Sequence, residues 1–81
     1  MTEQERIAIC AEVVRVLGKF EWFRDVVVWD KHPIALCPIL ELKVNYVPRL
    51  NDKDIRGFAL RIGFPDVRYT EVDSNGNPLN A

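Results

Sequence analysis

The chain has 81 residues, a formal net charge of -1, and 48% hydrophobic and 28% charged residues. The apolar content excludes an intrinsically disordered chain, and the length predicts a single domain over residues 1–81. The near-neutral balance argues against nucleic acid as a partner, because each phosphate contact needs a cation or a hydrogen-bond donor.

The cellular compartment is predicted from the lack of a signal peptide or membrane-spanning pattern and from the number of cysteines. The first residues are polar and acidic, unlike a signal peptide, and no apolar stretch approaches the ~20 residues that span a bilayer. Two cysteines, Cys10 and Cys37, are too few for a secreted disulfide framework. The sequence therefore predicts a cytoplasmic protein with reduced, structural thiols and no membrane partner.

The first predicted element is a helix that ends at about Leu17, before Gly18. Thr2 and Glu5 have the spacing of a capping box at its start. Two apolar stripes lie beside each other on the helical wheel: Ile7, Cys10, Val14 and Leu17 form one, and Ile9, Val13, Val16 and Phe20 form the other. Together they cover about half of the circumference, so we expect a wide buried face.

The next segment, Trp22 to Trp29, has the length and composition of a strand, but both of its registers are apolar. One register carries Trp22, Val26 and Val28, and the other carries Phe23, Val27 and Trp29. A strand with one face in water should alternate apolar and polar residues. This strand is therefore expected to need cover on both faces.

The remaining elements follow from turn residues and periodicity. A turn over residues 30–33 precedes a second strand from about Leu36 to Tyr46. A helix then runs from Asn51 to Ile62, and a third strand covers residues 67–72. Residues 73–77 are turn material, and residues 74–81 are expected to be a frayed tail.

The order helix-strand-strand-helix-strand predicts an α+β fold, a small two-layer sandwich with two helices on one face of a three-stranded, mostly antiparallel sheet. The first two strands should form an antiparallel pair. The residues that keep helical or strand period within their elements form the predicted core: Ile7, Val14, Leu17, Leu40, Leu42, Val44, Ile55, Phe58 and Ile62.

We find no pattern that marks a catalytic, cofactor, metal or small-molecule site. His32 is the only histidine, and the adjacent Pro33 explains it as part of a turn. Two separate cysteines and one histidine do not supply the close ligand pairs of a metal site. The Asp73-x-Asn75-x-Asn77 segment has its glycine misplaced for a calcium loop. The protein is therefore not expected to be an enzyme or to hold a cofactor.

The sheet face away from the helices is the predicted interface. Two helices cover only one face of a three-stranded sheet, which leaves a mixed patch of aromatic, apolar and charged residues: Trp22, Trp29, Cys37, Ile39, Glu41 and Lys43. This is the composition of a protein-binding surface. The alternative is that the first helix wraps further and that the tryptophans belong to the core.

Two function hypotheses follow. The first is a small protein-binding module, a regulator, inhibitor or adaptor, whose partner is another protein or a second copy. Small accessory proteins of phages and mobile elements, including inhibitors of host defence, are similar in style. The alternative is a nucleic-acid-binding module, because the element order resembles the type II KH arrangement that ribosome-binding factors use. That family's Gly-x-x-Gly clamp is absent, since Gly57 and Gly63 stand too far apart to form it.

Overall fold

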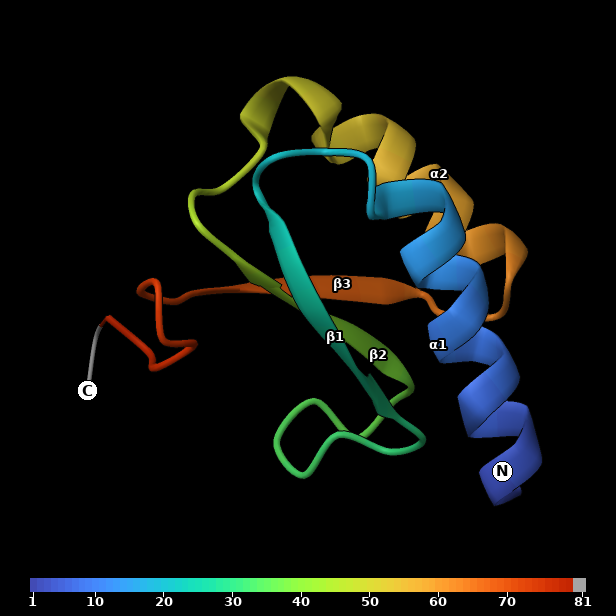
Figure 1. Ribbon diagram of the computed structural model, residues 1–81. Helices are drawn as coiled ribbons and strands as arrows, with labels where there is room; N and C mark the ends of the chain where they lie inside the picture. The colour runs from blue at the N-terminus through green and yellow to red at the C-terminus, as the bar shows by residue number, and fades with distance from the viewer. Residues whose placement is uncertain (80–81) are drawn as a thin grey trace.

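The elements of the structure follow the predicted order. The structure is a computed structural model that describes residues 1–79 (Figure 1). The elements are α1 (Glu3–Leu17), β1 (Phe23–Trp29), β2 (Ile39–Val44), a 3₁₀ turn η1 (Arg49–Asn51), α2 (Asp52–Arg61) and β3 (Asp66–Glu71). The predicted α+β class is confirmed.

The three strands form one sheet in the order β1-β2-β3. β1 and β2 are antiparallel, as predicted, and β2 and β3 are parallel. β2 and β3 are parallel because the crossover through α2 returns the chain to the end of the sheet at which β2 begins. Both helices lie on the same face of the sheet (Figure 1), where α1 packs against β1 and α2 against β3.

The core lies between the helices and the sheet. Its buried residues alternate along β1, β2 and β3, so that Val28, Leu40 and Val67 stand side by side in register. The predicted core residues that are buried are Leu17, Leu40, Leu42, Val44, Ile55 and Phe58, and Ile62 packs against them half-buried. The period of the second helix and of the second strand therefore predicted their buried core faces correctly.

The predicted core face of α1 was wrong for two residues. Ile7 is 60% exposed and Val14 is 48% exposed, whereas Val13 is fully buried. The apolar arc of α1 is wider than its contact with the sheet, so the rotation of the helix decides which part is covered. That rotation points Val13 and Leu17 at the sheet and leaves Arg6 free to donate to the Val28 carbonyl.

A β-bulge in β1 explains part of the reason why both registers of this strand are apolar. The pairing of β1 with β2 shifts register between Phe23 and Asp25. A bulge inserts one residue, so side chains on its two sides change parity. Phe23 therefore joins Val26 on the core face, and Val27 and Trp29 remain on the opposite face.

Both edges of the sheet carry acidic side chains that occupy backbone donors. Asp25 accepts the N–H of Val26 at 2.8 Å on β1, and Asp66 accepts the N–H of Val67 at 2.9 Å on β3. Charged side chains on an edge disfavour pairing with a strand of another chain. Addition of a further strand at either edge is therefore disfavoured.

Residues 73–79 fold back beside the end of β3. The Asp73 carboxylate accepts the N–H groups of Asn75 and Asn77, both at 2.9 Å, and Val72 forms a β-bridge with Pro78. The predicted turn over residues 73–77 is thus present. Residues 80 and 81 of the expected tail lie outside the described residues.

Candidate functional site

Two of the six side chains predicted for the interface are buried. Trp22 is 3% exposed, and its ring stacks on Phe20 with 5.1 Å between ring centroids. The turn closed by the Phe23 N–H to Phe20 carbonyl bond keeps both rings against the core. Ile39 is fully buried beside its register partner Trp29, where the loop over residues 30–38 returns to the sheet. This corrects the prediction of accessible side chains for Trp22 and Ile39.

The other predicted interface residues are half-buried on or beside the open face of the sheet, and Glu41 stands at its centre. The Glu41 carboxylate accepts the indole Nε1–H of Trp29 and the hydroxyl of Thr70, both at 2.8 Å. One carboxylate thus connects β1, β2 and β3. Burial alone would raise the pKa of Glu41, but the two hydrogen bonds and the nearby Lys43 outweigh it and leave that pKa below its ordinary value.

The loop between β1 and β2 is closed by His32, which has a structural part here. Its Nδ1 accepts the N–H groups of Ile34 and Ala35, both at 3.2 Å, and its ring meets Trp29 edge-on at 5.1 Å. Leu36 adopts a left-handed conformation with φ of 59°. Cys37, one of the two predicted interface residues outside the strands, lies near the end of this loop with a free thiol, and its carbonyl accepts the His32 N–H.

The open sheet face is therefore a weaker candidate site than its composition suggested. The indole donor of Trp29 is already used, and the other two large apolar side chains predicted for the patch, Trp22 and Ile39, are buried. What remains accessible is a mainly polar surface around Glu41, Lys43 and Thr70. The hydrogen bonds of Glu41 connect the three strands, so this network has a structural role that involves no ligand.

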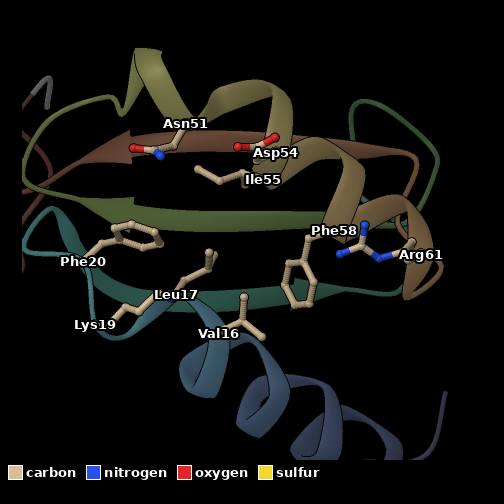
Figure 2. Close-up of a pocket in the computed structure, with 9 residues that line it drawn as sticks. All are labelled: Val16, Leu17, Lys19, Phe20, Asn51, Asp54, Ile55, Phe58 and Arg61. Atoms are coloured by element: carbon tan, nitrogen blue, oxygen red, sulfur yellow. The ribbon is translucent and has the colours of Figure 1, made fainter.

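A groove of about 200 Å³ between α1 and α2 is the better candidate (Figure 2). It exists because α1 packs on one edge strand and α2 on the other, so the space between the helices is filled only from the sheet side. Leu17, Ile55 and Phe58 are buried in its floor, and Val16 and Phe20 line it half-buried. The floor is thus apolar, and Val16 and Phe20 are the apolar lining residues that remain partly accessible.

The rim of this groove is polar and carries more positive than negative charge. Lys19 and Arg61 stand at its two ends, and Asn51 and Asp54 come from the start of α2 (Figure 2). The Lys19 ammonium lies 5.5 Å from the centroid of the Phe20 ring. Lys19, Arg61 and Asp54 form no salt bridge among residues 1–79. An apolar floor with a charged rim is the arrangement found in protein interfaces.

A second hollow of about 280 Å³ adjoins the groove through Asn51, which lines both. Its wall includes Trp22, Tyr46 and Leu50, and Leu50 is 99% exposed. Arg49 also lines it and is exposed. The second hollow thus resembles the groove, because it combines an exposed apolar side chain, Leu50, with an exposed basic one, Arg49.

A third hollow, beside β3, is lined by a polar cluster that is internally satisfied. Asp52 accepts the Tyr69 hydroxyl at 2.7 Å and the Arg56 guanidinium at 3.1 Å. Burial and that hydrogen bond raise the pKa of Tyr69 far above its ordinary value, and the Tyr69 hydroxyl lowers the pKa of Asp52. Arg56 and Arg68 both pair with Asp66. This cluster ties the start of α2 to β3 and leaves two of the arginines neutralised.

The groove was not predicted from the sequence, although its side chains were. Val16 and Phe20 belong to the second apolar stripe of α1, and Ile55 and Phe58 to the buried face of α2. Each pattern predicts burial against a neighbour. Nothing in either pattern says that the two helices stand apart above the sheet.

No family model, curated protein or solved structure matches this chain. Among residues 1–79, no group of three or more His, Cys, Asp or Glu side chains could hold a metal ion. None of the helices described here has the length and apolar character needed to cross a membrane.

Proposed function

We propose that the protein is a small, non-catalytic binding module that acts as a regulator, inhibitor or adaptor by occupying a surface of another protein. The observation that carries this proposal is the groove between α1 and α2, with Leu17, Ile55 and Phe58 in an apolar floor and the half-buried Val16 and Phe20 beside them. Buried apolar anchors in such hollows supply most of the free energy of protein binding.

The rim indicates the chemistry of the partner. Lys19 and Arg61 border the groove, Arg49 lines the adjoining hollow, and Asp54 is the one acidic side chain that lines either of them. Complementary charges favour the encounter and set specificity. We therefore expect a segment of the partner that inserts one or two apolar side chains and carries acidic residues beside them.

Photo-cross-linking from the groove tests the proposal. A photoreactive phenylalanine analogue replaces Lys19 on the rim, and in a control it replaces Lys53, an exposed α2 residue that lines none of the three hollows. We expect a specific cross-linked partner from position 19 and none from position 53. The partner, identified by mass spectrometry, is then purified and titrated with the unmodified protein.

The groove must also determine the affinity for that purified partner. Val16→Glu places a charge in the apolar groove, and Leu60→Glu makes the same chemical change at an exposed position outside it. We expect the first variant to weaken binding at least about tenfold, or about 1.4 kcal/mol, and the second to leave it unchanged. Equal cross-linking from positions 19 and 53, or equal affinity of the two variants, would contradict the proposal.

A further inference from the structure

The loop that joins β1 to β2 (Figure 1) is held closed by hydrogen bonds of a single residue, His32. Its backbone N–H donates to the Cys37 carbonyl at 2.9 Å, and its carbonyl accepts the Leu36 N–H at 2.8 Å. Its imidazole Nδ1 accepts the N–H groups of Ile34 and Ala35, both at 3.2 Å. The backbone and the side chain of His32 therefore both close the loop.

The two bonds to the imidazole require that Nδ1 carries no proton. In a neutral imidazole one nitrogen donates and the other accepts, so the ring proton of His32 is on Nε2. In an imidazolium ion both nitrogens are donors. A proton on Nδ1 would face two backbone N–H donors. Protonation of this ring therefore replaces two attractive contacts with repulsive ones and leaves two amides of the loop without an acceptor.

The closed loop has little besides these hydrogen bonds to stabilise its tip. Leu36 has a φ of 59°, in the left-handed region that a residue with a Cβ disfavours. Ile34 is 80% exposed and Leu36 is 64% exposed, so neither side chain is buried by the closed conformation. The closed loop thus depends on its hydrogen bonds and not on apolar packing at the tip.

The charged and titratable groups around the imidazole are of both signs. Those in the loop and on the neighbouring elements are Asp30, Lys31, the Cys37 thiol, Glu41, Lys43 and the amino terminus. Asp30 and Glu41 attract an imidazolium ion, but Asp30 already pairs with the amino terminus at 2.9 Å and Glu41 already accepts two hydrogen bonds. The lysines and the amino terminus repel it. The contacts that protonation reverses are therefore the two at Nδ1.

His32 is the only histidine of the chain, and it is half-buried, so solvent protons reach it. Histidine is the side chain that ordinarily changes charge between about pH 5 and pH 8, whereas carboxylates and lysines titrate outside this range. The hydrogen bond from Asp30 raises the pKa of the amino terminus above its ordinary value of 8.0. A conformational change between about pH 7.5 and pH 5 would therefore report on this one imidazole.

We propose that the loop between β1 and β2 is a pH-sensitive switch, which neutral His32 closes and protonation of its imidazole opens. In the closed state Ile34 and Leu36 form a fixed apolar tip. In the open state the amides of Ile34 and Ala35 have lost their acceptor, and Leu36 is free to leave the left-handed region. No residue of this loop lines the groove between the helices, so either proposal stands if the other fails.

NMR of the full ¹⁵N-labelled chain between about pH 7.5 and pH 5 tests the switch. The imidazole C–H signals follow protonation, and amide exchange with water at Ile34 and Ala35 follows the loop. After correction for the intrinsic pH dependence of exchange, we expect the protection of both amides to fall at least about tenfold as the imidazole takes up its proton. The Asn75 amide, which donates to the Asp73 carboxylate at 2.9 Å, is the internal control and should keep its protection.

His32→Asn is the matched control variant. The asparagine amide oxygen stands as many bonds from the backbone as Nδ1, accepts in the same kind of turn, and does not titrate. We expect its loop to stay closed over the whole pH range, and circular dichroism checks that the variant folds. An imidazole that remains neutral down to about pH 5, amide protection that is constant while the imidazole titrates, or an equal loss of protection in His32→Asn would overturn the proposal.

Discussion

Replacing Glu41 with alanine should destabilise the protein through the open face of the sheet and without disturbing the core. The carboxylate accepts hydrogen bonds from Trp29 on β1 and from Thr70 on β3, each at 2.8 Å. The alanine variant leaves a half-buried indole N–H and a hydroxyl without their acceptor. No hydrogen bond of the Glu71 side chain is present among residues 1–79, so Glu71→Ala is the matched control.

The size of the effect follows from the number and setting of these bonds. A hydrogen bond to a charged group contributes about 1.5–3 kcal/mol to stability. Water reaches part of this site and replaces some of what is lost, so we expect Glu41→Ala to lower the free energy of unfolding by about 1–3 kcal/mol. Thr70→Val should cost about 1 kcal/mol, and less in the Glu41→Ala background, because its partner is then already absent.

The dependence on pH has a defined sign. The pKa of Glu41 is lower in the folded protein than its ordinary value, so the unfolded chain binds more protons as the pH falls. The stabilisation from Glu41 is complete above its ordinary pKa and is lost as the pH falls from about 4.5 through the lower folded-state pKa. Glu41→Gln should therefore lose less stability than the wild type between about pH 5 and pH 3.

Urea unfolding, followed by tryptophan fluorescence and circular dichroism at several pH values, measures these quantities. A Glu41→Ala loss no greater than that of Glu71→Ala would refute the reasoning. Parallel pH profiles for the wild type and Glu41→Gln would also refute it. Either result would mean that the bonds across the three strands add no net stability.

Substitutions at three further positions test the core and the loop. Leu42→Ala should cost about 2–5 kcal/mol in urea unfolding, and a loss below about 0.5 kcal/mol would contradict the register of β2. The buried Nε1 of Trp22 has no hydrogen-bond partner among the described residues, so Trp22→Phe should change the stability by no more than about 1 kcal/mol, because loss of an unsatisfied donor offsets lost packing. Trp22→Ala should cost about 3–5 kcal/mol, and equal effects of both changes would argue against an unsatisfied indole. His32→Ala should cost about 0.5–1.5 kcal/mol by removing the acceptor of two loop N–H groups, and thermal unfolding should show His32→Asn closer to the wild type, since its amide oxygen can accept in the same turn.

The local signals in the sequence were sufficient for the elements and their order. The Thr2 and Glu5 capping box begins α1 as predicted, with both of its hydrogen bonds at 3.1 Å. The alternation from Leu40 to Val44 correctly assigned the buried face of β2. These features depend on neighbours within a few residues, which is why periodicity and capping patterns can predict them.

The strand from Trp22 to Trp29 was harder to interpret, because its burial depends on a bulge. With strict alternation, Phe23 belongs with Val27 and Trp29 on the open face. The register shift before Asp25 moves it to the core. A bulge is formed by the pairing of two strands, so the sequence of one strand does not reveal it. The open face consequently carries fewer apolar side chains than the composition of the strand implied.

The sequence by itself determined the class of fold, the order of its elements and the apolar residues available for burial, because these follow from local periodicity. Tertiary packing decided which of those residues remain accessible. The rotation of α1 buried Val13 and exposed Ile7 and Val14, and the placement of the helices over opposite edge strands opened the groove. Both outcomes arise because an apolar arc of half a helix exceeds the width of its contact with a three-stranded sheet. The angle at which the helix settles therefore depends on every side chain beneath it.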